Sequence, residues 1–261
     1  MMATFSSADA IENFSVVKST LDIGFYLQQL PKDSIILVDV DDTIITPRSK
    51  TFRTAPYNKL IDNIKKNKDN YPAYQEIVSN WRLQRKVMLL DENWPAMLKQ
   101  LREKFSVYAI TKMDTGRFGN IPSMEQWRYE ELRDLGIEFS KNNEIPSTIL
   151  DDGQNNPMFY NGIFITGERS KSQTLDIYRS FLKSSIIVLI DDRLEHLEDI
   201  KAFCDKHSIK FIGLLFKGLE NFKDRPDPAI SDFQAKYLIE NAQWLEDDKA
   251  YKVMSQSKTK K

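Results

Sequence analysis

The residues best suited to chemistry follow a short apolar run. Ile35-Ile36-Leu37-Val38 is mostly β-branched, which predicts a buried strand of a parallel sheet. The chain continues Asp39-Val40-Asp41-Asp42-Thr43, so three carboxylates and a hydroxyl crowd the end of that strand. Such carboxylates repel one another unless a cation or a proton lies among them. Because open α/β sheets bind ligands at the carboxyl ends of their strands, we expect a site here.

Three further groups follow the same design. The apolar run 107–110 ends in the hydroxyl of Thr111, and the apolar run 186–190 ends in Asp191-Asp192. Ser170-x-x-Gln173 is a capping-box pattern that places Lys171 in the first turn of a helix. The carboxyl ends of parallel strands lie along one edge of a sheet. We therefore expect these groups to converge although they are far apart in the sequence.

This set suits phosphoryl transfer. Mg²⁺ binds through one or two carboxylates plus phosphate oxygens, and Asp39 and Asp192 could supply those carboxylates. A carboxylate can also act as a nucleophile and form an aspartyl-phosphate. Asp41, two residues further on, is then placed to protonate the leaving oxygen and later to activate water. Thr111 and Lys171 would neutralise and orient the phosphate oxygens.

Taken in order, these motifs resemble the four motifs of the haloacid-dehalogenase-like (HAD) phosphohydrolases, over roughly residues 33–216. The resemblance implies that Asp39 is the nucleophile and a metal ligand. It implies that Asp41 is the general acid/base and gives its backbone carbonyl to Mg²⁺. Thr111 and Lys171 would bind phosphate, and Asp192 with Asp191 would complete the metal site. The family's dehalogenases lack an acid at the position of Asp41, which points to phosphate esters.

More narrowly, residues 94–111 and 161–216 are similar to an uncharacterised bacterial branch of the family, found partly in bacteria that live inside host cells. One departure is His196, where family members usually carry Asn or Asp, and Glu195 is the candidate substitute. From the sequence we assign His196 a structural or exposed role. Asp192 is also predicted to cap the next helix, with Glu195 completing the capping box.

The alternation of strands and helices predicts an α/β fold, with a parallel sheet and helices on both faces. The resemblance implies that this is a Rossmann-like, HAD-like core. We expect that core to comprise 1–47 and 91–216, and residues 48–90 to form a small helical cap insertion. The segment 217–261 is predicted to form one helix, 233–245, and a frayed basic tail.

Composition narrows the classes of partner. The formal net charge of -1 argues against bulk nucleic acid and anionic membranes as partners. Cys204 is the single cysteine, so no intrachain disulfide can form. No apolar run reaches the roughly 20 residues of a membrane span, and the start of the chain lacks a secretory signal pattern. We expect a cytoplasmic protein. The resemblance to proteins of intracellular bacteria leaves open export into a host cell as an effector.

A basic run occupies residues 48–68, with seven Lys or Arg and a single acid. By default it is a solvated face, and its alternative role is to steer anionic substrates.

The function expected from these features is a Mg²⁺-dependent phosphatase that works through an aspartyl-phosphate. A cap this small leaves the site open to a phosphoprotein, and a small phosphometabolite is an equal alternative. Other functions stay open: a catalytically weak HAD-fold binding or scaffold protein, and a phosphomutase. A response-regulator type of phospho-acceptor fits less well, because its paired acids precede its lysine, whereas Asp191-Asp192 follows Lys171.

Overall fold

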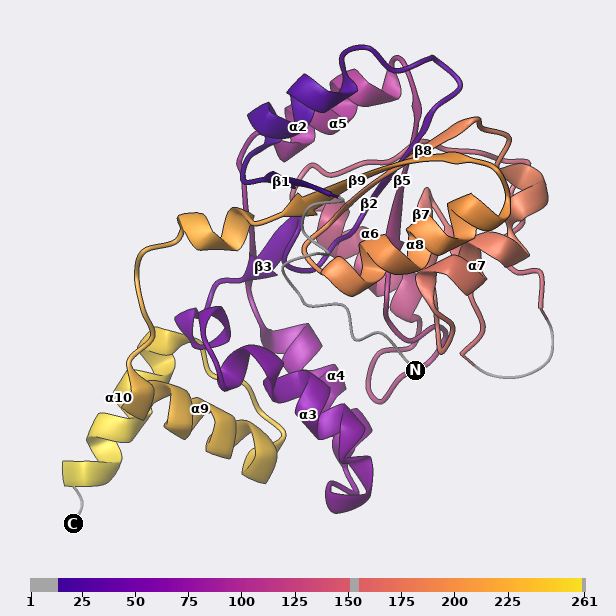
Figure 1. Ribbon diagram of the computed structural model, residues 1–261. Coiled ribbons are helices and arrows are strands. Elements are labelled where there is room, and N and C mark those ends of the chain that lie inside the picture. Colours follow the sequence, from indigo (N-terminus) through magenta and orange to yellow (C-terminus); the bar gives the residue numbers. More distant parts are fainter. Residues whose placement is uncertain (1–13, 151–154, 260–261) are drawn as a thin grey trace, which may run out of the picture. The chain divides into compact units, whose positions relative to one another are not determined.

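The computed structural model describes residues 14–150 and 155–259 of the 261-residue chain (Figure 1). These residues divide into two compact units. Unit 1 takes the residues up to 45, those from 89 to 116 and those from 124 to 221. Unit 2 takes 46–88, 117–123 and the residues from 222 on. The inserted segment therefore shares its unit with the loop 117–123 and with the C-terminal segment, two partners that the sequence did not indicate.

Unit 1 is built on a seven-stranded sheet with the order β1-β9-β8-β2-β5-β7-β6. Only β6 runs antiparallel to its neighbour, so the predicted α/β class with a mostly parallel sheet is confirmed. The strands are β1 (Ser15–Val17), β2 (Ile35–Val38), β5 (Ser106–Thr111), β6 (Met158–Tyr160), β7 (Ile163–Ile165), β8 (Ile186–Asp191) and β9 (Lys210–Phe216). The helices are α2 (Thr20–Leu27), α5 (Trp94–Arg102), α6 (Met124–Arg133), α7 (Lys171–Ile177) and α8 (Leu194–Lys206).

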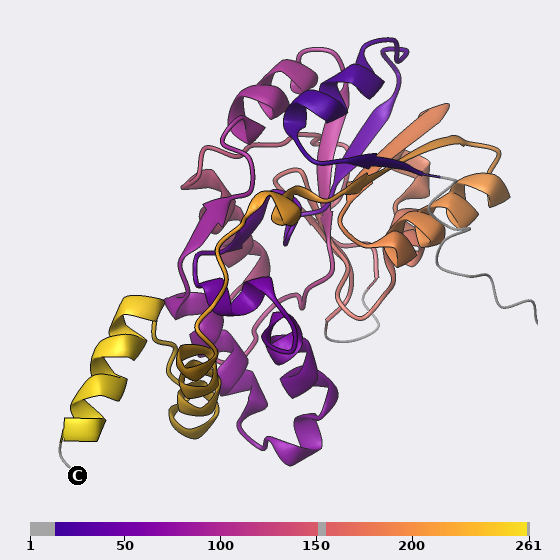
Figure 2. The same ribbon diagram turned by 60° about the vertical axis from the view of Figure 1, so that its left-hand side comes forward.

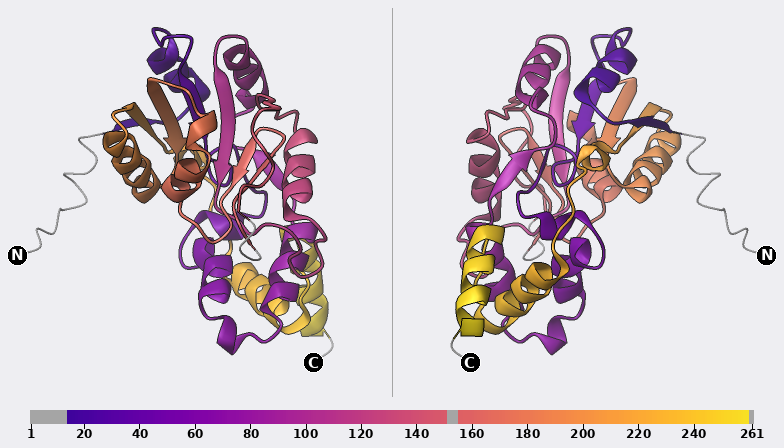
Figure 3. Two further views of the ribbon diagram at one scale, coloured as in Figure 1. Left: turned by 90° about the vertical axis from the view of Figure 1, so that its right-hand side faces the viewer. Right: turned by 90° about the vertical axis from the view of Figure 1, so that its left-hand side faces the viewer.

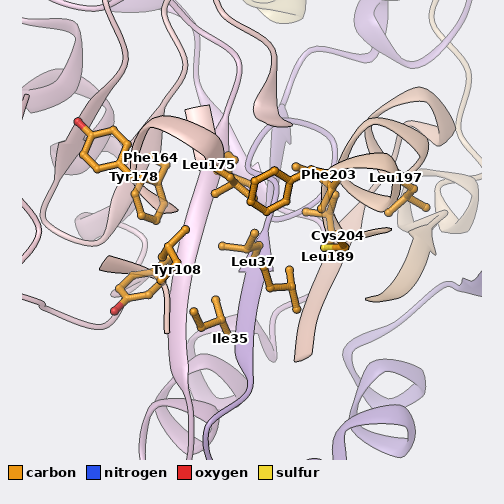
Figure 4. Packing of buried hydrophobic residues seen from close by; sticks show 14 of the residues in the cluster. Ile35, Leu37, Tyr108, Phe164, Leu175, Tyr178, Leu189, Leu197, Phe203 and Cys204 are labelled. Atoms are coloured by element: carbon orange, nitrogen blue, oxygen red, sulfur yellow. The ribbon is translucent and has the colours of Figure 1, made fainter. Parts of the chain in front are cut away.

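Both faces of this sheet are covered, as the two views in Figure 3 show. On one face, Ile35 and Leu37 of β2 join a buried cluster with side chains of α7 and α8 (Figure 4). Leu215 of β9 belongs to the same cluster, so the next residue, Phe216, faces the other way. There its ring lies 5.7 Å from that of Trp94 in α5, measured between centroids. Burial on both faces explains why the central strands are continuously apolar.

The order in which the chain adds strands to the sheet reverses at β2. From β2 the chain continues to β5 and the β6–β7 hairpin on one side, and it returns through α7 to β8 and β9 on the other. Val38 is in register with Ala109 of β5 and with Ile190 of β8. Ligands of open α/β sheets bind at the carboxyl ends of strands at such a switch point. The fold thus places the end of β2 where a ligand site is expected.

Unit 2 is mainly helical. Its main helices are α3 (Leu60–Lys66), α4 (Tyr74–Gln84), α9 (Pro228–Asn241) and α10 (Asp247–Thr259). The two-stranded sheet of β3 (Ile45–Pro47) and β4 (Val87–Leu89) lies where the chain passes from one unit to the other. The prediction of a single C-terminal helix is wrong, because a second helix, α10, follows α9. The predicted frayed tail is 258–261, of which 260–261 lie outside the described residues.

The C-terminal segment completes the core of unit 2, where α9 and α10 pack together (Figure 2). The ring of Phe52 from the insertion lies 5.3 Å from Trp81 and 5.1 Å from Trp244, measured between centroids. The buried amide of Gln234 in α9 donates to the Leu245 carbonyl at 2.8 Å. Phe52 and Trp244 are far apart in the sequence, which is why local pattern did not reveal their contact.

Charge divides between the units. Among the described residues, unit 1 carries 18 Lys or Arg and 24 Asp or Glu, a formal charge of −6. Unit 2 carries 17 Lys or Arg and 10 Asp or Glu, a formal charge of +7. The near-neutral total conceals this segregation. Over residues 14–150 and 155–259, no helix combines the length and the apolar character that crossing a bilayer requires.

Candidate active site

Asp39 lies at the carboxyl end of β2, with its side chain only 8% exposed. Its backbone N–H donates to the Ile190 carbonyl at 2.9 Å, so the strand ladder continues through this residue. Its Oδ1 accepts a hydrogen bond from Lys171 Nζ at 2.5 Å. Burial raises the pKa of Asp39 to about 6 and nearby Asp191 adds to the rise, although Lys171 opposes it. Asp39 is therefore mainly a carboxylate at neutral pH.

A compact turn follows Asp39 and ends the strand. Asp42 adopts a left-handed conformation with φ 60°, which Asp tolerates better than most residues. The Val40 carbonyl accepts the N–H of Ile45 at 3.0 Å. Trp94 Nε1 donates to the Thr43 carbonyl at 3.1 Å and secures the turn from α5. The turn therefore fixes the backbone that carries Asp39, Asp41 and Asp42.

Lys171 connects the ends of β2 and β8. Ser170 caps α7, and the predicted capping box with Gln173 is confirmed, which fixes Lys171 as the first helical residue. The fully buried Nζ donates to Asp39 and, at 2.6 Å, to Asp191 Oδ2. Burial alone would lower the pKa of Lys171, but the two carboxylates outweigh it and raise the pKa. The buried lysine is therefore charged.

Asp191 is the last residue of β8 and fully buried. Besides the bond from Lys171, Asp191 Oδ1 accepts a hydrogen bond from the backbone N–H of Arg193 at 3.0 Å. Burial raises the pKa of Asp191, but attraction to Lys171 and the contact with His196 reverse the effect and lower it. The predicted capping role of Asp192 is wrong. The N-cap residue of α8 is Arg193, which makes no side-chain capping bond. The backbone N–H of Arg193 donates to Asp191.

Asp192 experiences the crowding of acids most strongly. Burial raises the pKa of its carboxyl to about 9, with further contributions from Asp39, Asp191 and Asp42. Its backbone carbonyl accepts a hydrogen bond from Lys217 Nζ at 2.9 Å. This side chain would gain most from a cation at the end of the sheet.

Asp41 has a partner that the sequence did not identify. Its Oδ2 accepts a hydrogen bond from Arg128 of α6 at 2.7 Å, and Arg128 also donates to Glu131 at 2.7 Å. The sequence carried one signal of this role, since Arg128 stands midway between Met124 and Leu132 on the buried face of α6. An arginine at a position that packing alone would give to an apolar residue indicates a buried charge pair.

Thr111 ends β5 and is buried. Ala109 is in register with Val38, so Thr111 lies one strand away from the turn that follows Asp39. Its backbone carbonyl accepts the N–H of Thr166 at 3.1 Å. The sheet thus brings Thr111 to the same edge as Asp39, as the sequence predicted.

Of the two roles expected for His196, structural or exposed, the structure supports the structural one, because the side chain is largely buried beside Asp191. Its Nδ1 lies 3.0 Å from Asp191 Oδ1. Asp39, Asp191 and His196 each offer one ligand atom, and these atoms all lie within 4.8 Å of one another. The sequence marked this position as a departure from the family's pattern but gave no partner for it.

Acids are concentrated at this end of the sheet. Five carboxylates gather there: Asp39, Asp41, Asp42, Asp191 and Asp192. The buried cations paired with them are Lys171 and Arg128. Arg193 also lowers the pKa of Asp192, and Lys217 Nζ donates to the Asp192 backbone carbonyl. A concentration of carboxylate oxygens fits a hard divalent cation such as Mg²⁺. Mg²⁺ prefers oxygen ligands, so the nitrogen of His196 is better suited to holding Asp191 in place than to binding this ion.

Sequence comparison relates the chain to proteins without a known activity. Residues 16–251 match the family described as "Protein of unknown function (DUF2608)". An uncharacterized protein of Rickettsia prowazekii (strain Madrid E) is 25% identical over 251 residues, which cover 94% of this chain and 91% of that protein. One from Rickettsia bellii (strain RML369-C) is 24% identical over 229 residues, or 81% and 77% of the two chains. No solved structure matches the chain.

Proposed function

The chain belongs to the DUF2608 family of proteins of unknown function, and we propose from the site itself that it is a Mg²⁺-dependent phosphatase with a HAD-like core. It would hydrolyse phosphate monoesters through an aspartyl-phosphate. The observation that carries the proposal is the buried cluster in which Lys171 bridges Asp39 and Asp191 at the sheet's switch point. The substrate class is a phosphoprotein or a small phosphometabolite.

Asp39 is the proposed nucleophile. One of its oxygens attacks phosphorus, and the bond from phosphorus to the ester oxygen breaks. Lys171 keeps Asp39 ionised despite burial, since the pKa of about 6 stays below neutrality. Lys171 Nζ, 2.5 Å from Asp39, would also attract the phosphate oxygens as the bond to Asp39 forms. Thr111, at the same edge, would supply a hydroxyl donor to these oxygens.

Asp41 is the proposed general acid/base. In its protonated form it gives a proton to the departing ester oxygen, and the resulting carboxylate takes a proton from the water that hydrolyses the aspartyl-phosphate. Its side chain is 44% exposed, whereas that of Asp39 is 8% exposed. The two carboxylates thus have different environments, which suits two different roles.

Asp39, Asp192, Asp191 and the backbone carbonyl of Asp41 would hold Mg²⁺. When bound, the ion would neutralise phosphate oxygens and help to orient the ester. The raised pKa of Asp192 supports a cation here, because an added positive charge would relieve the repulsion among the acids.

The test is hydrolysis of an aryl phosphate by the purified chain, with and without EDTA. We expect Asp39→Asn to lower kcat at least about 1,000-fold, because it removes the nucleophile. Asp205→Asn is the matched control, since Asp205 is exposed and pairs only at the surface with Lys201. Acid quenching should trap a phosphoryl group on Asp39, located by mass spectrometry. Turnover that survives EDTA, or an active Asp39→Asn, would refute the mechanism.

A further inference from the structure

Arg128 links α6 to the proposed general acid/base. We propose that Arg128 is a positioning residue that holds the Asp41 carboxyl group in the orientation needed for proton transfer. This inference rests on the proposed phosphatase function and adds to it a residue outside the four sequence motifs. The contact between Arg128 and Asp41 at 2.7 Å is its starting point.

Asp41 needs such a partner. It follows the last residues of β2 in a tight turn, and its side chain is 44% exposed. An exposed carboxylate can rotate among several orientations, only some of which direct an oxygen to a substrate. One oxygen of Asp41 is occupied by Arg128. The proton that Asp41 gives to the ester oxygen is then carried by the second oxygen, Oδ1, whose direction is defined.

Arg128 is itself held firmly. Its side chain is 3% exposed, and its second terminal nitrogen donates to Glu131 Oε2 at 2.7 Å. Its Nε lies 3.4 Å from the sulfur of Met113, and its guanidinium carbon lies 5.0 Å from the centroid of the Trp127 ring. The planar fork of arginine allows the two acids to be bound by different nitrogens at once. The guanidinium can therefore fix Asp41 because its own direction is fixed.

Packing does not account for this arginine. Met124, Arg128 and Leu132 form the buried face of α6, where an apolar side chain would serve as well. Replacing buried ion pairs with apolar residues of similar volume is often neutral or stabilising. A buried arginine at this position is better explained by what its guanidinium does to Asp41.

The positioning role predicts a dependence on the leaving group. An alkyl phosphate needs a proton from Asp41 as its ester bond breaks, whereas an activated aryl phosphate departs with little help. The ratio kcat/KM reports the step that releases the alcohol or phenol. Loss of positioning should therefore lower kcat/KM for the alkyl ester much more than for the aryl ester.

The experiment compares Arg128→Met with wild type on an alkyl phosphate and on p-nitrophenyl phosphate, using the full chain with Mg²⁺. We expect kcat/KM to fall about 30- to 100-fold for the alkyl ester and less than about 3-fold for the aryl ester, within the range of general acid catalysis. In an Asp41→Asn background, Arg128→Met should cause almost no further loss. Arg133→Met is the control, because Arg133 lies on the same helix but is exposed.

Two further variants protect the test against misfolding. Arg128→Lys keeps the charge but loses the fork, and Glu131→Gln weakens the hold on Arg128. Both should show the same selective loss to a smaller degree, with circular dichroism unchanged. Equal losses on both esters, or a further loss in the Asp41→Asn background, would overturn the positioning role. A wild type inactive on both esters would instead refute the phosphatase function.

Discussion

Lys171→Met tests the charge balance on which the site depends. The buried Nζ lies between two carboxylates, 2.5 Å from Asp39 and 2.6 Å from Asp191. Methionine has a similar length and no charge, so the change leaves two buried acids facing each other without their shared cation. Removing one partner of a buried ion pair costs about 3–5 kcal/mol. We expect a loss of that order in the free energy of unfolding at pH 7.

The pH dependence of this loss has a defined sign. Without Lys171, the folded-state pKa of Asp39 and Asp191 should rise above the unfolded values, because burial and mutual repulsion both disfavour the charged form. The folded variant then binds more protons than the unfolded chain, so its stability falls as pH rises from about 4 toward neutrality. The slope reaches about 1.4 kcal/mol per pH unit for each retained proton. The variant should be closest to wild type in acid.

Urea unfolding at several pH values, followed by circular dichroism, measures both effects. Adding Asp39→Asn to Lys171→Met should recover part of the stability, since it removes one of the two opposed charges. Lys206→Met is the control, because Lys206 is 66% exposed and should change stability by less than about 0.5 kcal/mol. A Lys171→Met chain as stable as wild type at pH 7, or one destabilised further by Asp39→Asn, would show that the cluster does not work by charge balance.

Two other expectations concern the acids and the basic unit. Burial and neighbouring acids raise the pKa of Asp192 to about 9, so without Mg²⁺ its contribution to stability is lost as pH rises from about 4 to about 9. Asp192→Asn should therefore be more stable than wild type at pH 8 in EDTA. An unchanged urea midpoint would contradict this expectation. Unit 2 has a formal charge of +7 and includes the exposed Lys59, Lys66 and Lys68. Changing all three to Gln should raise KM for a phosphopeptide at low salt but not at high salt. The control, Lys201→Gln in unit 1, should leave KM unchanged.

The charge segregation bears on the choice of substrate class. A phosphopeptide carries its charges over many residues and can be attracted by several lysines at once, while a small phosphometabolite presents its charges at one point. Salt-sensitive KM values for peptides alone would favour a macromolecular substrate. Equal salt dependence for both would leave the basic unit with a general role in attracting anions.

The sequence alone predicted most residues of the candidate site. Apolar runs followed by acids, a hydroxyl or a capped lysine are local signals, and they predicted the six candidate residues Asp39, Asp41, Thr111, Lys171, Asp191 and Asp192. The parallel α/β class followed from the same alternation. The structure confirmed that class, and it brings Lys171 into contact with Asp39 and Asp191.

Only the tertiary structure decided the partners. Arg128 lies 87 residues from Asp41, and nothing near either residue predicts that contact. The N-cap residue of α8 is Arg193, and its N–H donates to Asp191 rather than to Asp192. The helix therefore begins at Leu194, and its first turn brings His196 to Asp191. The C-terminal helices join the insertion through Phe52 and Trp244, which pack across nearly 200 residues of chain. Side-chain pairs of this kind depend on how whole elements pack. The periodicity of one segment does not predict which other segment it will contact.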